Sequence, residues 1–154
     1  MPLYFAYGSN MDLVAMGQRC PKARVLGTAR LARHSFILMG RTGYASVRRD
    51  RAGTVHGVLF DLALSDVAPL DRYEDVARGL YAKAIQPVTL DGGGVRQALV
   101  YLGSDMTIGG TPPVGYMEGI VSAARTAGLP AAYVAGLESL VPRFTRRCAA
   151  GPIS

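Results

Sequence analysis

The sequence predicts an α+β domain in which a curled or barrel-like sheet carries helices at one side. Three observations support this prediction: strand-like segments outnumber helical ones, a glycine-rich turn at 91–94 separates two of the strands, and Gly128 and Pro130 mark a joint between two helices. With 154 residues, the chain is long enough to form one domain with a substantial core. We expect this domain to comprise residues 1–144 and residues 145–154 to be a frayed tail.

In the first half of the chain, apolar and aromatic runs predict strands at residues 3–7, 24–39, 44–49 and 55–62. Gly8-Ser9-Asn10 ends the first strand in a tight turn. Asn10 or Asp12 is then expected to cap a short helix through Gln18, which Pro21 stops. The strand at 55–62 is nearly continuous in its apolarity, which favours a central position in the sheet.

In the second half, a helix is expected over 65–76, with Ser65 as its N-cap. Residues 81–90 and 95–103 predict a hairpin around Asp91-Gly92-Gly93-Gly94. The stretch 103–115 is rich in Gly and Pro and predicts a loop or lid. Two helices follow, at about 114–127 and 130–141.

Composition excludes several classes of protein. Hydrophobic residues make up 49% and charged residues 18%, which excludes a disordered chain. No apolar run is as long as a membrane span. Cys20 and Cys148 lie far apart without metal-ligand spacing, as expected for a cytoplasmic protein. The net charge is +6, but the arginines are scattered and match no recognition motif, so we expect a solvated surface, no specific nucleic acid and no membrane partner.

Glu74 is the most informative residue. It follows Leu70 by four residues and Val67 by seven, so helical spacing puts its carboxylate on the apolar face. A carboxylate there must either be paired or lie in a pocket that raises its pKa and gives it a chemical role. Asp71 and Asp75 share a neighbouring face, where water or Arg78 can neutralise them.

Few other residues predict catalytic chemistry. His34 and His56 lie within strands and are expected to be hydrogen-bonded sheet residues. No nucleophile elbow, metal-ligand spacing or phosphate-binding glycine loop is present in the sequence. An enzyme with this sequence would use no metal and no cofactor, and general acid–base chemistry by a carboxylate is what remains. The turn Tyr7-Gly8-Ser9-Asn10-Met11 could offer backbone amides to an anion, or it could be an ordinary strand-to-helix turn.

Several segments together resemble the γ-glutamylcyclotransferase family of the AIG2-like superfamily. In chain order, these segments are Tyr4 to Met11, Val55 to Phe60, Leu70 to Val76 with Tyr81 after it, Val100 to Leu102, Pro112 to Tyr116 and Gly128 to Tyr133. The resemblance extends from residue 3 to about 141. Each segment alone is a weak signal, and their shared order makes the resemblance strong.

The resemblance implies a mixed β-barrel with flanking helices. It also implies that Glu74 is the general base, that the turn from Tyr7 to Met11 (Tyr7, Gly8, Ser9, Asn10 and Met11) binds the glutamyl group, and that Tyr81 and Tyr116 line the pocket. For the two tyrosines, ring packing alone is an alternative explanation. The implied reaction is attack of a γ-glutamyl substrate's α-amine on its own side-chain amide, which gives 5-oxoproline and a free amine or amino acid.

One residue departs from the family pattern, because Asp75 stands where glycine is common after the glutamate. A second carboxylate there could raise the pKa of Glu74 or alter the approach of a substrate. Two alternatives stay open: a same-fold enzyme that acts on γ-glutamylamines or removes a γ-glutamyl protecting group, and a non-catalytic protein that binds a small molecule in the same pocket. The sequence does not determine the leaving group or the oligomeric state.

Overall fold

The computed structural model describes residues 2–143, and the expected tail at 145–154 lies outside them. Five strands are present in the described residues: β1 (Leu3–Ala6), β2 (Arg24–Leu38), β3 (Ala45–Asp61), β4 (Tyr81–Leu90) and β5 (Val95–Gly103). Four α-helices accompany them: α1 (Leu13–Arg19), α2 (Val67–Tyr73), α3 (Tyr116–Ala127) and α4 (Ala131–Glu138). Three short 3-10 helices complete the list: η1 (Ser9–Met11), η2 (Leu64–Asp66) and η3 (Val76–Arg78).

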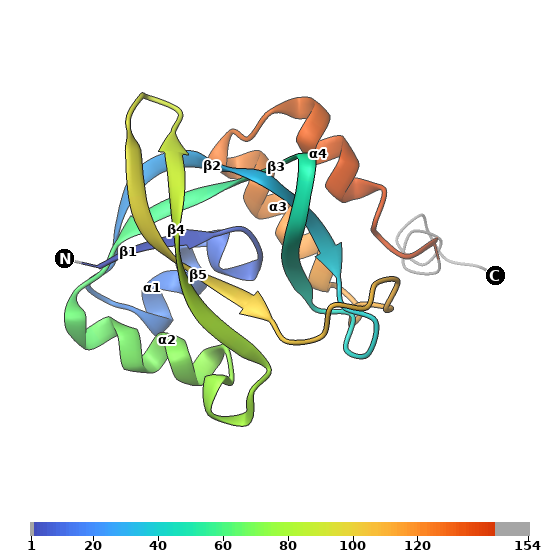
Figure 1. The fold of residues 1–154 in the computed structure, drawn as a ribbon, viewed down its shortest axis with the longest axis horizontal. Coiled ribbons are helices and arrows are strands. Elements are labelled where there is room, and N and C mark those ends of the chain that lie inside the picture. Colours follow the sequence, from blue (N-terminus) through green and yellow to red (C-terminus); the bar gives the residue numbers. More distant parts are fainter. Residues whose placement is uncertain (1, 144–154) are drawn as a thin grey trace.

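The strands close into a barrel in the order β1-β3-β2-β4-β5 (Figure 1). All neighbouring strands are antiparallel except β1 and β5, which pair in parallel at Tyr4 and Leu99. The barrel is therefore mixed, as expected. Closure places Tyr4 at the seam, beside a strand that lies more than ninety residues later in the chain.

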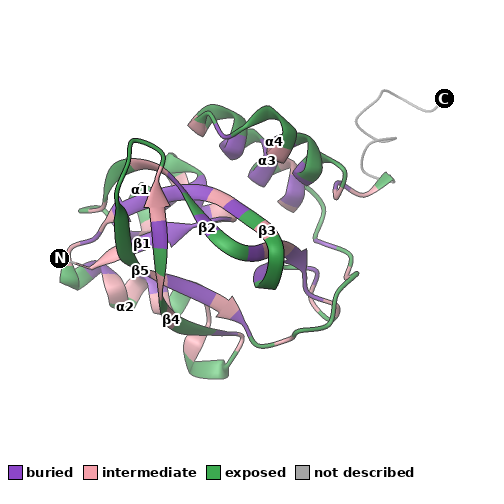
Figure 2. Ribbon diagram, turned by 45° about the horizontal axis from the view of Figure 1, so that its top comes forward, coloured by how far each residue is buried: buried purple, intermediate pink, exposed green. Residues whose placement is uncertain are grey.

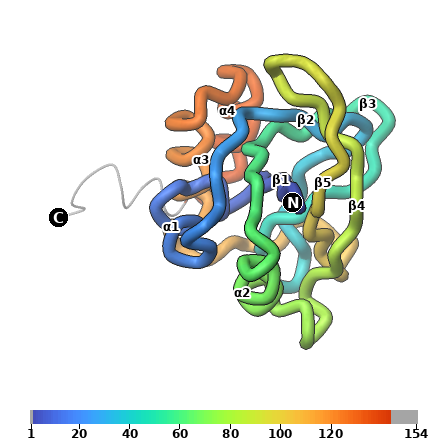
Figure 3. The backbone as a smooth tube through the Cα atoms, turned by 90° about the vertical axis from the view of Figure 1, so that its left-hand side faces the viewer, coloured from blue at the N-terminus to red at the C-terminus, as the bar shows by residue number. Residues whose placement is uncertain are grey.

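The helices lie around one side of this barrel. In Figure 3, α1, α3 and α4 lie opposite the β4–β5 hairpin, and α2 lies below. Buried residues line the barrel strands and the inner faces of α3 and α4, whereas the tip of the hairpin is exposed (Figure 2). No helix of the described residues is long and apolar enough to cross a membrane.

Gly57 shows how closely β1 and β3 approach each other. A Cβ atom at this position would lie 2.3 Å from the carbonyl oxygen of Ala6 and 2.9 Å from a ring carbon of Phe5. Only glycine fits without displacing backbone or a fully buried ring. The glycine in the Val55–Phe60 segment is therefore explained by packing.

The predicted break between strands 44–49 and 55–62 is wrong, because β3 runs through it. Between the pairs Ala32–Thr54 and His34–Arg49, the single residue Arg33 of β2 lies opposite four residues of β3. Arg33 has a positive φ of 61°, and the Asp50 carboxylate accepts a hydrogen bond from the Ala52 amide at 3.1 Å. The polar stretch 50–53 is thus a large, irregular bulge within a continuous strand pair.

The expected helix at 65–76 is shorter than predicted, and Ser65 does not cap it. Ser65 lies inside η2, and the Asp66 side chain instead accepts a hydrogen bond from the Ala63 amide at 3.3 Å. At the first helix, Asp12 is the N-cap and accepts hydrogen bonds from the amides of Val14 and Ala15, so the alternative, Asn10, is excluded as the cap. The hairpin at 81–90 and 95–103 and the helix end at Gly128 are confirmed.

Candidate active site

A small pocket opens where the end of β1 meets the end of α2. Its lining comes from the barrel strands, from the turn after β1, from the residue after α2 and from the start of α3: Tyr4, Tyr7, Gly8, Ser9, Asn10, Ala45, Glu74, Tyr81, Tyr101 and Tyr116. The pocket thus brings Glu74 together with six of the seven expected binding residues. Met11 is the exception, since its buried side chain lines a separate groove that includes residues of α1 and α3.

Glu74 lies one residue beyond the last residue of α2, yet helical geometry still positions it. Its amide donates to the Leu70 carbonyl oxygen at 3.0 Å, which continues the helical hydrogen-bond pattern by one residue. The Glu74 side chain therefore shares a face with Leu70, which is fully buried. The expected inward direction is borne out by the position of Glu74 in the pocket, although the helix ends earlier than predicted.

The carboxylate of Glu74 has one side-chain hydrogen-bond donor in the described residues. Asn10 Nδ2 donates to Glu74 Oε1 at 3.3 Å and to the Tyr4 hydroxyl at 3.0 Å. Burial raises the pKa of Glu74 to about 7, and the positive charge of Arg19 opposes that rise. A carboxyl group with this pKa exchanges protons near neutral pH, as a general base must.

The turn after β1 lines the pocket beside Glu74. Hydrogen bonds within the turn use the amides of Met11, which donates to Gly8 O at 3.0 Å, and of Asp12, which donates to Ser9 O at 3.2 Å. They do not use the amides of Gly8, Ser9 and Asn10. The Ser9 hydroxyl lies 2.9 Å from the Tyr73 hydroxyl, which ties the turn to the end of α2.

Tyrosines form a rigid frame around this pocket. The Tyr81 hydroxyl donates to Ala45 O at 2.5 Å, and the Tyr116 hydroxyl accepts from Ala45 N at 3.0 Å, so both rings are fixed on one backbone unit of β3. The Tyr7 hydroxyl donates to the Tyr101 carbonyl oxygen at 2.5 Å. Burial raises the pKa of Tyr7, Tyr81, Tyr101 and Tyr116, so their hydroxyl groups stay neutral.

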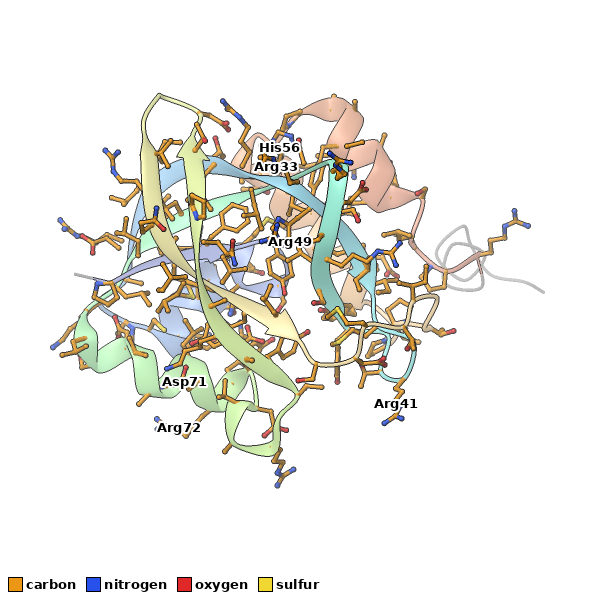
Figure 4. All side chains as sticks on the ribbon, in the orientation of Figure 1. Arg33, Arg41, Arg49, His56, Asp71 and Arg72 are labelled. Atoms are coloured by element: carbon orange, nitrogen blue, oxygen red, sulfur yellow. The ribbon has the colours of Figure 1, made fainter. Side chains whose placement is uncertain are left out.

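Sequence reasoning missed four residues of this arrangement. Tyr4 and Tyr101 line the pocket, and both lie in segments that carry the family resemblance. The Asp71 carboxylate accepts hydrogen bonds from the Tyr101 hydroxyl at 2.6 Å and from Lys83 Nζ at 2.8 Å (Figure 4). Lys83, and not Arg78, therefore neutralises its charge. Arg19, in the last turn of α1, donates to Asn10 Oδ1, and no feature of the sequence indicated it.

The backbone conformation of Asp75 restricts which residues suit this position. Its φ of 53° and ψ of 44° are left-handed, a conformation that glycine adopts freely and that aspartate tolerates better than most residues. Its carboxylate lies 3.9 Å from Arg78 and does not line the pocket. Burial raises the pKa of Glu74 and Arg19 opposes that rise, so the raised pKa does not need a contribution from Asp75.

Neither histidine lies at this site. His34 is buried, with Nδ1 2.9 Å from the Ala32 carbonyl oxygen, as expected of a sheet residue. The ring of His56 packs edge-on against that of Tyr133, with 4.8 Å between the ring centres. The buried Nδ1 of His56 has no hydrogen-bond partner within residues 2–143, so the expected hydrogen bond is absent for that nitrogen. The described residues contain no group of three or more His, Cys, Asp or Glu side chains that could hold a metal ion.

Comparison with known proteins agrees with the fold. A sequence model of the AIG2-like family matches residues 54–137, more than half of the chain, and the protein therefore belongs to the AIG2-like family. The matched region contains Glu74, Tyr81, Tyr101 and Tyr116 and begins after the Tyr7–Met11 turn. No functionally curated protein matches the sequence.

Solved structures extend the similarity to nearly the whole chain. A γ-glutamyl cyclotransferase is similar with a TM-score of 0.82 and 25% identity, over 97% of this chain and 99% of the other. An uncharacterized human protein is similar with a TM-score of 0.83 and 25% identity, over 97% and 98% of the two chains. YkqA from Bacillus subtilis shares the fold with a TM-score of 0.78 at 23% identity, over 94% of this chain and 54% of its own.

Proposed function

We propose that this protein is a γ-glutamyl cyclotransferase in which Glu74 is the general base. The observation that carries the proposal is a largely buried carboxyl group with a pKa of about 7, in a pocket between a glycine-containing turn and a frame of neutral tyrosines. Family membership and the similar γ-glutamyl cyclotransferase structure support the same reaction.

The pKa of Glu74 suits the proton transfer that this reaction requires. The α-amine of a γ-glutamyl compound is an ammonium ion at neutral pH, and only its neutral form can attack a carbonyl carbon. An α-amino group has a pKa of about 8, so an exposed glutamate at about 4.3 is a weak base toward it. Glu74, at about 7, is a much stronger base toward this amine than an exposed glutamate is.

In the proposed reaction, Glu74 takes a proton from the α-ammonium group and the freed nitrogen attacks the γ-carbonyl carbon. A carbon–nitrogen bond forms to close the five-membered ring, and the bond to the leaving nitrogen breaks. Glu74 returns its proton to that leaving nitrogen as the bond breaks, and the second proton that the attacking nitrogen loses on ring closure makes the released amine an ammonium ion. The nucleophile belongs to the substrate, so the protein mainly holds the folded-back geometry in which the two groups meet.

The turn after β1 is suited to hold the charged or polar oxygens of the substrate. The amides of Gly8, Ser9 and Asn10 are not used by the hydrogen bonds of the turn, and they lie in residues that line the pocket. Amides in such a turn can bind a carboxylate or the oxyanion that develops on the γ-carbonyl oxygen. The fixed rings of Tyr81 and Tyr116 would bound the space in which the substrate folds.

The test is a screen for 5-oxoproline release from γ-glutamyl amino acids, γ-glutamylamines and glutathione. The wild-type protein should release 5-oxoproline from at least one class, and Glu74→Gln should reduce that rate by about 10²-fold or more, the usual contribution of a general base. The class that is turned over also decides between the amino-acid and amine variants of the reaction.

Asp75→Asn is the matched control, because it removes the adjacent carboxylate, which does not line the pocket. It should keep activity within a few-fold of wild type. A Glu74→Gln protein that turns over substrate at the wild-type rate would exclude the proposed base. A wild-type protein that binds γ-glutamyl compounds but releases no 5-oxoproline would favour a binding protein instead.

A further inference from the structure

Arg19 differs from every other basic residue that the structure describes. It is half-buried, whereas the remaining lysines and arginines within residues 2–143 are exposed. Figure 4 shows this for Arg41 and Arg72, whose side chains extend away from the barrel. Arg19 closes the last turn of α1, where a positive charge also favours the helix dipole.

Two contacts hold the guanidinium group of Arg19 at the edge of the pocket. Its central carbon lies 3.5 Å from the centre of the Tyr73 ring, a cation–π arrangement. It also donates a hydrogen bond to Asn10 Oδ1. The hydroxyl oxygens of Tyr73 and Ser9 are in turn 2.9 Å apart. The contacts of Arg19 and Tyr73 therefore link α1, α2 and the turn after β1.

The hydrogen bond to Asn10 has a consequence for Glu74. An arginine can only donate hydrogen bonds, so the atom of Asn10 that faces Arg19 must be the carbonyl oxygen. The amide NH₂ of Asn10 then points the other way, where it donates to Glu74 Oε1 at 3.3 Å and to the Tyr4 hydroxyl at 3.0 Å. Without Arg19, the Asn10 amide could turn over and direct its oxygen at the carboxylate.

We propose that Arg19 is a positioning residue for Glu74: its hydrogen bond fixes the direction of the Asn10 amide, which then presents its NH₂ group to the carboxylate. This inference rests on the proposed function for its meaning in catalysis, although the geometry it describes does not depend on turnover. The ionised form of Glu74 gains a donor and a nearby positive charge, and both act against the cost of burial.

The other ionisable side chains that line the pocket with Glu74 do not offset this effect. They are five tyrosines: Tyr4, Tyr7, Tyr81, Tyr101 and Tyr116. Burial raises the pKa of each, so none carries a charge near neutral pH. Arg19 is the cation that acts on Glu74.

Carboxyl-carbon NMR titration of Glu74 tests the proposal without any substrate. The signal is assigned by its loss in Glu74→Gln. Arg19→Met keeps an apolar side chain against Tyr73 but removes the donor and the charge, and it should move the titration midpoint of Glu74 upward by about 0.5–1 pH unit. Arg19→Lys keeps the positive charge but replaces the planar guanidinium group, and it should shift the midpoint of Glu74 less than Arg19→Met does.

Arg72→Met is the matched control, since Arg72 is close to Glu74 in sequence but exposed and directed away from the barrel (Figure 4). It should leave the midpoint in place. If a substrate is found, the acidic limb of the kcat/KM profile should move with the NMR midpoint in Arg19→Met, and activity should recover at high pH.

An unchanged midpoint in Arg19→Met, with the fold intact by circular dichroism, would overturn the role of Arg19 even in an active enzyme. If Arg19→Met does not fold, Arg19→Leu, which also removes the donor and the charge, takes its place, and an unchanged midpoint there would do the same. Failure of the proposed function would look different, because no γ-glutamyl compound would release 5-oxoproline while the midpoint still shifted.

Discussion

Glu74→Gln should stabilise the folded protein at alkaline pH, because the pocket disfavours the ionised carboxylate. Burial raises the pKa of Glu74 from its ordinary value of 4.5 to about 7. The folded state therefore binds the proton more tightly than the unfolded state between these two values. Stability falls as pH rises through this range, and the full cost is present above pH 7. Glutamine is neutral at every pH and does not carry this cost.

The size of the effect follows from the pKa change. One pKa unit corresponds to about 1.36 kcal/mol, so a rise from 4.5 to about 7 costs wild type about 3 kcal/mol at pH 8.5 and less than about 1 kcal/mol at pH 5. The hydrogen bond from Asn10 survives, since the glutamine carbonyl oxygen can accept it. The gain from the substitution should therefore be largely electrostatic.

Urea denaturation of wild type and Glu74→Gln at pH 5, 7 and 8.5 measures this difference. The stability advantage of the variant should increase with pH across the series. Glu138→Gln changes an exposed side chain at the end of α4 and is the control, which should not show the same increase. A Glu74→Gln advantage that is equal at all three pH values, or that shrinks as pH rises, would refute the assignment of a raised pKa to Glu74.

Two further predictions concern the backbone. Gly57→Ala should destabilise the protein by about 1–3 kcal/mol in chemical denaturation, because the added Cβ would lie 2.3 Å from Ala6 O. A fall in the free energy of unfolding of less than about 0.5 kcal/mol would contradict this packing. Asp75→Val should cost about 1–2 kcal/mol because a β-branched residue is strained at a φ of 53°, while Asp75→Gly should change stability by less than about 0.5 kcal/mol. Equal melting curves for the two Asp75 variants would show that the left-handed conformation carries no strain.

Much of the fold could be predicted from the sequence, because its signals there are local. The β4–β5 hairpin follows from alternating strands around a run of glycines, and the end of α3 follows from Gly128. The bulge at 50–53 could not be predicted, since a polar stretch in one strand is indistinguishable from a loop until its partner strand is known. The predicted N-cap at Ser65 is wrong, because Ser65 lies inside η2 and the Asp66 side chain accepts the hydrogen bond from the Ala63 amide.

The candidate site divides in the same way. The sequence by itself determined that Glu74 faces inward, because helical spacing relative to Leu70 is a local property that the hydrogen bond between them preserves. Only the tertiary structure decided how basic that carboxylate is. Its pKa depends on burial beneath tyrosines from distant strands and on Arg19, a residue more than fifty positions away that reaches it through Asn10. Desolvation and charge act through space, so they are determined only when barrel closure brings these segments together.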